Sequence, residues 1–276
     1  FLLRDKTVSL TTVKGHLRVD LRLSNYHLQK LQGARLTSAT LVDSKGKMWL
    51  HVQVKRDVPP TAEPQEVIGV DLGRTDIAVT STGKSWSGKA VTKVRDRFAK
   101  TRQMVQKNCS KGTRSTRRRA GQLLQRLSGK EQRFQKHVNH VVSKAIVSEA
   151  QVLSAAIALE DLTGIRERTN TQPRSSTERR RSNSWAFHQL RGFVEYKAAL
   201  AGVQVIPINP AYTSQTCHCC KHIGKRQGKR FECGNCGHVG DADHNGAQVI
   251  RLVGLTVTRP RGSGVLSCAF RASESP

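Results

Sequence analysis

The sequence is poor in acidic residues, with 20 Asp and Glu against 47 Lys and Arg in 276 residues. The formal net charge is therefore +27, and the isoelectric point is about 10.6. Solubility alone rarely calls for more than about eight net charges on a small domain, so the excess is not explained by solubility. A chain with this charge binds polyanions, and nucleic acid is the polyanion that we expect.

Long hydrophobic runs are also missing. No stretch approaches the run of about eighteen apolar residues that a membrane-spanning helix needs, so we expect no membrane contact of that kind. The chain opens at Phe1 with neither an initiator methionine nor a leader, from which we expect a fragment or a mis-started reading frame. Cys109 and Cys268 have no obvious pairing partner, which favours a reducing compartment and a cytoplasmic location.

Four of the seven cysteines form the strongest motif. They make two CxxC pairs, Cys217 with Cys220 and Cys233 with Cys236. Each pair places two thiolates on one side of a tight turn, and two such turns are typical of a four-cysteine zinc ribbon. Four ligands close the shell, so this Zn²⁺ is expected to be structural and to hold Asp241 and Asp243 in place. Buried thiols or disulfides are the disfavoured alternative. Cys219 could compete for the metal, but its spacing does not fit a standard ribbon.

The remaining patterns predict a small β-domain at 1–60, a larger core at 61–255 and a disordered tail at 256–276. Alternating strand patterns occupy 7–23 and 34–58 of the first part. Their exposed Arg and Lys could contact phosphate or simply face solvent. In the core, we expect strands at 66–73, 77–80, 155–162 and 203–208, helices at 184–201 and 245–255, and a mobile basic loop at 163–183.

Residues 93–136 contain fifteen Lys and Arg but only two acidic residues. Apolar residues recur there at helical intervals and predict two long helices, about 93–107 and 117–153, with a break at 111–113. A helix face this basic would repel itself unless phosphates neutralised it, so contact with nucleic acid is favoured over a solvated face. The expected contacts are Arg95, Arg102, Lys107, Arg114, Arg117, Arg118, Arg119 and Arg126.

Three acidic residues stand at the ends of separate predicted elements. Asp71 and Glu160 end two buried strands, and Asp243 stands at the start of a late helix. Oxygen ligands from separate elements suit Mg²⁺, and two ions about 3.5–4 Å apart would clamp the attacking water and the leaving oxygen of a phosphodiester. Asp71 would bridge both ions, and the other two acids would each hold one. With the strand order, this set predicts an α/β fold with a ribonuclease H-like core.

Several stretches together resemble one protein family. These are GVDLGRTDIAVTSTG around Asp71, ALEDLTGI around Glu160, NPAYTSQTC at 209–217, the cysteine ribbon, and DADHNGAQVI at 241–250. They resemble the RuvC-type nuclease half of TnpB (OrfB) proteins, which bacterial insertion sequences encode and which are related to type V CRISPR effectors. The resemblance covers about residues 35–255.

The resemblance implies a RuvC core with a zinc ribbon inserted at 212–240, preceded by part of a wedge-like β-domain. It also implies that Asp71, Glu160 and Asp243 are catalytic, with Asp241 next to the site. The implied partners are DNA and a guide RNA from the transposon end. Base pairing would read most of the target, and protein contacts would read a short flanking motif.

Family members usually carry a longer N-terminal half, so the resemblance also implies an N-terminally truncated protein. Gly246 stands where the family tends to have alanine. Two other interpretations stay open: a non-catalytic DNA- or RNA-binding remnant of the family, and a zinc-ribbon RNA-binding protein of ribosomal type. The intact acids favour the nuclease, and the start at Phe1 favours the remnant. The ribosomal interpretation leaves Asp71 and Glu160 without a role.

Overall fold

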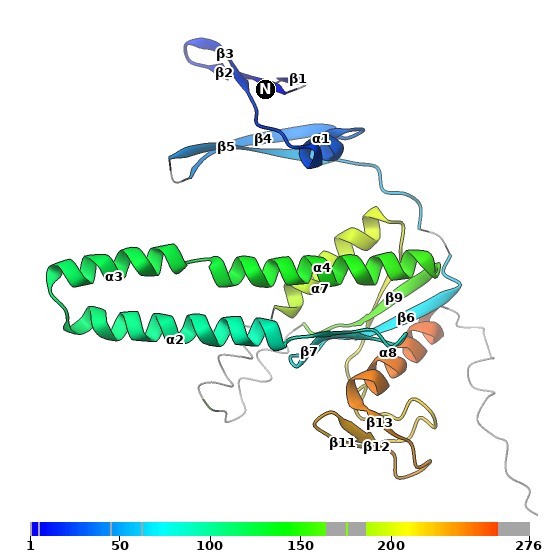
Figure 1. The fold of residues 1–276 in the computed structure, drawn as a ribbon. Helices are drawn as coiled ribbons and strands as arrows, with labels where there is room; N and C mark the ends of the chain where they lie inside the picture. The colour runs from blue at the N-terminus through cyan, green and yellow to red at the C-terminus, as the bar shows by residue number, and fades with distance from the viewer. Residues whose placement is uncertain are drawn as a thin grey trace, which may run out of the picture. The chain divides into compact units, whose positions relative to one another are not determined.

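The computed structural model describes residues 2–4, 6–44, 46–61, 63–163, 175 and 186–258. Its contacts divide into two units, Phe1–Val58 and Pro59–Pro276 (Figure 1). Most of the loop expected at 163–183 and most of the tail expected at 256–276 lie outside the described residues.

The smaller unit is mainly β-structure, as its alternating pattern predicts. Its elements are β1 (Leu2–Arg4), β2 (Thr7–Thr12), β3 (Gly15–Asp20), α1 (Asn25–Leu31), β4 (Arg35–Ser44) and β5 (Lys47–Lys55). The first three strands form one antiparallel sheet, and β4 and β5 form a separate hairpin. The helix α1 was not predicted, because seven residues are too few to show a helical period. Among the described side chains of this unit, only Val8 is a buried hydrophobic residue.

The larger unit is built on a five-stranded sheet in the order β10-β9-β6-β7-β8. Its strands are β6 (Glu66–Asp71), β7 (Asp76–Thr80), β8 (Ser85–Ser87), β9 (Ala155–Glu160) and β10 (Val205–Ile208). Strand β9 runs parallel to both β6 and β10, whereas β6, β7 and β8 form an antiparallel meander. The predicted hairpin and the two later strands are confirmed, and β8 is an additional edge strand.

Helices cover both faces of this sheet. Successive strand residues point to opposite sides, so each strand contributes side chains to both helix layers. Ile68 and Ile157 belong to a hydrophobic cluster with α4 (Lys130–Val152) and α7 (Phe187–Leu200). Val67 and Ala158 belong to the cluster beneath α8 (Ala242–Thr258) on the other face. The strands therefore read as continuous apolar runs in the sequence, and both of their faces are buried.

The basic segment forms three helices rather than two. Helices α2 (Lys89–Lys111) and α3 (Arg114–Leu127) are separated by Gly112 and Thr113, which confirms the predicted break. The prediction of one long helix over 117–153 is wrong, because α3 ends at Leu127 and α4 begins at Lys130. Gly129 between them has φ of 73°, a left-handed conformation that interrupts the helical path. Figure 1 shows α2 lying alongside α3 and α4 in an antiparallel arrangement.

A small antiparallel ribbon precedes the last helix. It consists of β11 (Lys225–Gln227), β12 (Arg230–Glu232) and β13 (Val239–Asp241), and β13 runs directly into α8. Helix α8 begins three residues earlier than predicted, because the Asp241 carboxylate accepts hydrogen bonds from the backbone N–H groups of Asp243 and His244, each over 2.9 Å. It continues to Thr258, so the assignment of 256–258 to a disordered tail is wrong. None of the helices in the described part of the chain has the length and apolarity that crossing a bilayer requires.

Candidate active site and metal centre

Asp71 and Glu160 end two neighbouring parallel strands on the same face of the sheet. Val70 pairs with Leu159 across β6 and β9, so the two acids follow at adjacent positions. By the alternation of strand residues, both share the face that α8 covers. Asp243 lies in the first turn of α8. Three elements far apart in the sequence thus bring three carboxylates together at one edge of the core.

The closeness of these acids is visible in their electrostatics. Burial, followed by the charges of Glu160 and Asp243, raises the pKa of Asp71 to about 7. Burial also raises the pKa of Glu160, whereas the hydrogen bond that Thr213 donates to this carboxylate acts to lower its pKa. Glu160 is only 9% exposed and Asp243 only 6%. Carboxylates that repel one another in a largely buried place carry unbalanced negative charge, which favours a cation beside them.

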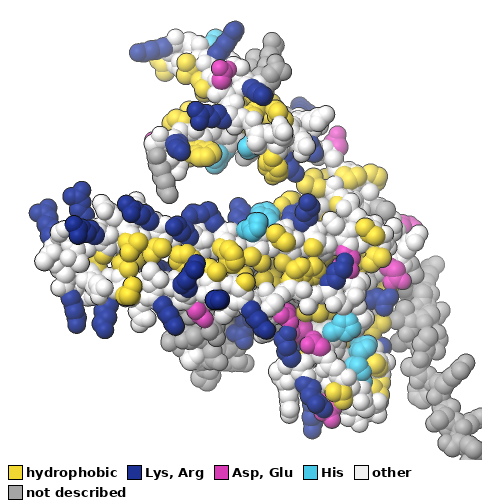
Figure 2. All heavy atoms as spheres, viewed as in Figure 1, with side chains coloured by type: hydrophobic (Ala, Val, Ile, Leu, Met, Phe, Trp, Pro, Cys, Tyr) yellow, Lys and Arg dark blue, Asp and Glu magenta, His cyan; other side chains and the backbone are white. Residues whose placement is uncertain are grey.

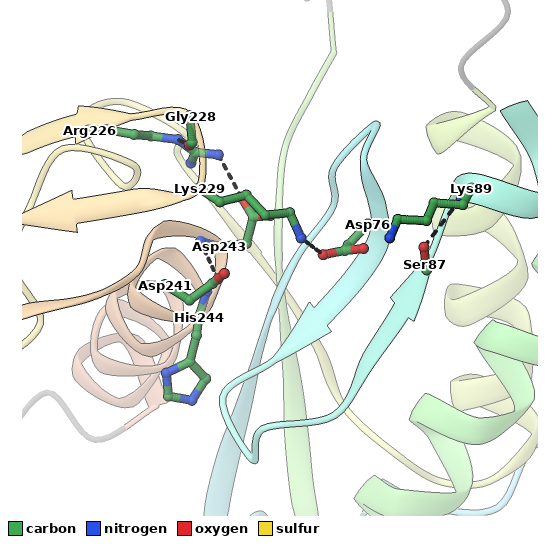
Figure 3. A network of polar contacts seen from close by, with 9 residues as sticks. All are labelled: Asp76, Ser87, Lys89, Arg226, Gly228, Lys229, Asp241, Asp243 and His244. Carbon is green, nitrogen blue, oxygen red and sulfur yellow. Dashed lines mark hydrogen bonds and ion pairs between the residues drawn. The ribbon is translucent and has the colours of Figure 1, made fainter.

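Arg226 places a positive charge directly against this acidic set. Its Nη2 donates to Oδ1 of Asp243 over 2.6 Å (Figure 3). The same guanidinium acts to lower the pKa of Asp71 and of Glu160. Neither Arg226 nor Thr213 was identified from the sequence. The only signals were the basic run KRQGKR and the stretch NPAYTSQTC, and neither indicates which acid each residue would meet.

The second carboxylate at the end of β9 has a different environment. Asp161 accepts hydrogen bonds from the backbone and hydroxyl of Thr163 and from the guanidinium of Arg191. These bonds lower the pKa of Asp161 to about 2. Arg191 also contacts Glu195 on α7 over 2.8 Å. Asp161 is therefore held in an ion-pair network on α7, whereas Glu160 faces the other acids.

A groove of about 600 Å³ lies beside Asp243, between the loop after β6 and the ribbon. Its lining includes the basic side chains of Arg74, Arg226 and Lys229. Lys229 also forms an ion pair with Asp76 of β7, which ties the ribbon to the sheet (Figure 3). A groove with cations on its walls and carboxylates beside it suits a phosphodiester strand, because the cations attract the phosphates toward the acids.

The four predicted cysteines meet in the ribbon. Their sulfur atoms all lie within 4.8 Å of one another. The Sγ atoms of Cys217 and Cys236 are 3.7 Å apart, and those of Cys220 and Cys233 are 3.4 Å apart. A tetrahedral zinc with bonds of about 2.3 Å requires sulfur separations of about 3.8 Å, so the arrangement fits a metal ion of this size and softness. The cluster could therefore hold a metal ion.

The eight basic residues predicted to contact nucleic acid divide into two groups. Six are exposed on α2 and α3: Lys107, Arg114, Arg117, Arg118, Arg119 and Arg126. Arg102 instead forms an ion pair with Glu131 of α4 over 2.9 Å. Arg95 is half-buried, and burial lowers its pKa. Figure 2 shows Lys and Arg side chains along the outer edges of these helices, flanking a stripe of hydrophobic side chains.

Two family models match the larger part of the chain. Residues 50–163 match OrfB_IS605, described as a probable transposase, and residues 187–250 match the Cas12f1-like TNB domain. The second match contains the ribbon and Asp243, and the first contains Asp71 and Glu160. The two matches therefore include all of the candidate acids and cysteines.

Individual proteins agree with these models. A TnpB-like protein of Methanocaldococcus jannaschii is 28% identical over 251 residues, which is 87% of each chain. The CRISPR-associated endodeoxyribonuclease Cas12f1 of Sulfoacidibacillus thermotolerans is 35% identical over 133 residues, which is 47% of this chain and 29% of the relative. The chain thus spans most of the archaeal relative but less than a third of the second one.

Among solved structures, the cryo-EM structure of a Cas12f1–sgRNA–target DNA complex resembles this one with a TM-score of 0.54 at 18% identity. The likeness covers 76% of this chain and 55% of that chain. The chain therefore has an α/β fold similar to that of Cas12f1.

Proposed function

Since the chain belongs to the TnpB (OrfB) family, we propose that it is an RNA-guided DNA endonuclease with a ribonuclease H-like, RuvC-type core. In this proposal Asp71, Glu160 and Asp243 are catalytic and hold Mg²⁺. The observation that carries it is the meeting of the three carboxylates on the α8 face of the sheet, where burial and mutual repulsion raise the pKa of Asp71 to about 7. An acidic cluster formed at this electrostatic cost is typical of a functional site rather than of a structural one.

Bound there, Mg²⁺ would activate the attacking water and neutralise the departing 3′ oxygen of a phosphodiester. The residues of the chain prepare that chemistry. Asp71 must release its proton before it can serve as an anionic ligand, so its affinity for a cation rises with pH up to about 7. Thr213 fixes one oxygen of Glu160 by donating its hydroxyl. Arg226 neutralises part of the acidic charge in the metal-free protein, and it lines the groove where a phosphate would lie.

In this proposal the cysteine cluster holds a structural Zn²⁺. Strand β13 of the ribbon ends at Asp241, which caps α8, so the fold of the ribbon sets the position of Asp243 two residues later. Closing four thiolates around zinc would stabilise the ribbon and keep that carboxylate in register with Asp71 and Glu160. This zinc would fix the position of Asp243 and would take no part in the cleavage step.

The partners that we propose are target DNA and a guide RNA encoded at the transposon end. The structurally similar Cas12f1 was solved in a complex with an sgRNA and target DNA, which supports partners of this kind. In this chain, the exposed arginines of α3 and the net charge of +27 supply the phosphate-neutralising surface that such partners need. Residues 61–255 would form the nuclease core, and residues 1–60 part of a wedge-like domain.

The test is a cleavage assay with the protein and its co-purified RNA, using guide-paired and single-stranded DNA. Mg²⁺ should support cutting, whereas Ca²⁺ should support binding only, because it is too loosely coordinated to hold the in-line geometry. Asp71→Ala and Glu160→Gln should each reduce cleavage by several orders of magnitude while nucleic-acid affinity is kept or raised.

Asp161→Asn is the matched control, because it removes the neighbouring carboxylate, whose bonds are to Thr163 and Arg191. It should leave cleavage within about threefold of wild type, since that side chain faces away from the acidic set. Equal cutting by wild type and Asp71→Ala would overturn the assignment of the active site. RNA binding without any cleavage by the wild-type protein would instead identify a non-catalytic nucleic-acid-binding member of the family.

A further inference from the structure

We propose that the ribbon carries a second metal site, formed by His218, Cys219 and His238, which binds one Zn²⁺ beside the four-cysteine cluster. One potential ligand atom from each of these residues lies within 4.8 Å of the others. Cys219 is the cysteine of the first knuckle that the ribbon spacing leaves without a role. Its sulfur is not one of the four that converge in the cysteine cluster.

The strongest support for this site is the orientation of the His218 ring. Asn245, only 1% exposed, donates from Nδ2 to the carbonyl oxygen of Thr216 over 2.7 Å, so its Oδ1 is left as an acceptor. That oxygen lies 3.1 Å from the backbone nitrogen of His218 and 2.9 Å from its Nδ1. Nδ1 must therefore carry the proton, and the lone pair of the neutral ring resides on Nε2.

This arrangement is the one that metal-binding histidines use. Such a histidine donates its second ring N–H to a fixed acceptor, which sets the tautomer and aims the other nitrogen at the metal. Here Nε2 of His218 lies 3.4 Å from Sγ of Cys219. A tetrahedral zinc with bonds of about 2.0–2.1 Å to nitrogen and 2.3 Å to sulfur requires about 3.6 Å between those two atoms.

The third ligand comes from the opposite knuckle. The ring of His238 stands edge-on to that of His218, with centroids 4.6 Å apart and planes at 89°. His238 is half-buried and Cys219 is exposed, so the cluster lies at the surface, where an ion can enter. Two imidazoles and one thiolate form a borderline-soft set that suits Zn²⁺ and not Mg²⁺. Three protein ligands leave a fourth position for water, so this site should bind more weakly than the closed four-cysteine cluster.

The alternative is a simple hydrogen bond from the Cys219 thiol to Nε2 of His218, with no metal. Metal counting distinguishes the two. The full chain, free of any affinity tag and kept reduced, is dialysed against buffered free Zn²⁺, and bound zinc is measured by elemental analysis. We expect two zinc ions per chain for the wild type and one for Cys219→Ser, whose hydroxyl can still donate to His218 and preserve the fold. Cys109→Ser is the matched control, because Cys109 lies on α2, and it should still bind two.

Cobalt substitution gives a second readout. Cys219→Ser should remove the absorption that arises from one thiolate while the spectrum of the four-cysteine cluster remains. His238→Gln should weaken only the second binding step, by at least about tenfold. One zinc ion in both the wild type and Cys219→Ser at saturation, or two in Cys219→Ser, would overturn the proposal. The proposal depends on zinc in the four-cysteine cluster only for the total number of ions. One ion in the wild type and none in Cys219→Ser would support the second site and overturn the four-cysteine one.

Discussion

Arg226 donates to Oδ1 of Asp243 over 2.6 Å, and this ion pair joins β11 of the ribbon to the first turn of α8. Asp243 is buried, and the Arg226 side chain is one-third exposed. The pair places a positive charge against acids that otherwise repel one another, because the same guanidinium opposes the rise in pKa at both Asp71 and Glu160. In the metal-free protein, Arg226 therefore does part of what a bound cation would do.

Replacing Arg226 with Gln should destabilise the Mg²⁺-free protein by about 2–3 kcal/mol. The expected loss is below the 3–5 kcal/mol typical of a broken buried pair, because solvent screens the partly exposed guanidinium. Added Mg²⁺ should recover most of it, since a cation held by the same acids replaces the missing charge. Thermal unfolding with and without Mg²⁺ measures both effects. Arg230→Gln, exposed on β12 and 3.6 Å from Glu232, is the control and should change little. A loss that Mg²⁺ leaves unchanged would contradict the prediction.

Local patterns explain why much of the candidate site could be predicted. Each CxxC pair shows in the sequence alone, and Asp71 and Glu160 follow apolar runs that end abruptly. The partners of these residues could not be predicted, because they depend on the packing of distant elements. Thr213 reaches Glu160 across 53 residues of chain. Glu160 and Asp161 are equivalent in the sequence, and only the strand alternation and Arg191 of α7 distinguish them.

The helices show the same limit. The apolar period over 117–153 predicts one uninterrupted helix, and Gly129 does not interrupt that period, so the break there was missed. Arg102 looks like any other basic residue of the segment, yet Glu131 meets it because α2 and α4 pack against each other. The early start of α8 depends on one side chain, Asp241, whose capping role is only visible once the helix exists.

The raised pKa of Asp71 should make the Mg²⁺-free protein less stable as pH rises. In the native protein Asp71 keeps its proton up to about pH 7, whereas the unfolded chain releases it near 3.8. The native state binds more protons between these values, so its free energy of unfolding falls across that range. Asp71→Asn has no such proton to lose. The free energy of unfolding of Asp71→Asn relative to that of wild type should grow by about 2 kcal/mol between pH 5 and pH 7, at no more than about 1.4 kcal/mol per pH unit.

Chemical denaturation of both proteins at pH 5, 6, 7 and 8, in buffer that keeps zinc but lacks Mg²⁺, measures this difference. It should level off above pH 7 to 8. Because a bound cation favours the ionised carboxylate, saturating Mg²⁺ should reverse the order and make wild type the more stable protein at pH 8. A constant difference at all four pH values would show that Asp71 has an ordinary pKa.

The exposed arginines of α3 should dominate the salt dependence of nucleic-acid binding. For duplex DNA the logarithm of the affinity falls with the logarithm of salt by about 0.9 per neutralised phosphate. Reversing Arg117, Arg118 and Arg119 to Glu should therefore reduce the slope by up to about 3. Fluorescence anisotropy over a series of salt concentrations gives the slope. The same three positions changed to Lys keep the charge and should keep the slope, so a loss in both triple variants would indicate a structural effect instead.

Gly69 of β6 lies directly against the backbone of α8. A Cβ at this position would stand closer than 3.0 Å to the carbonyl oxygen of Ala247 and to backbone atoms of Arg251. Main-chain atoms cannot move aside as a flexible side chain can, so Gly69→Ala should push the helix away from the sheet. We expect a loss of about 3 kcal/mol in the free energy of unfolding, at the upper end of what overpacking costs.

The same displacement should abolish cleavage, because α8 carries Asp243 and Gly69 lies two residues before Asp71 on the same face. Binding of zinc should persist, since all four cysteines belong to the ribbon and the clash at Gly69 falls further along α8, at Ala247 and Arg251. Gly192→Ala provides the control: its Cβ would meet nothing within 4 Å in α7, so it should be neutral or stabilise by up to about 1 kcal/mol. Urea unfolding, the cleavage assay and zinc analysis on both variants test the argument. Normal stability in Gly69→Ala would mean that α8 does not pack on β6 as closely as this structure shows, and the position of Asp243 beside Asp71 would lose its support.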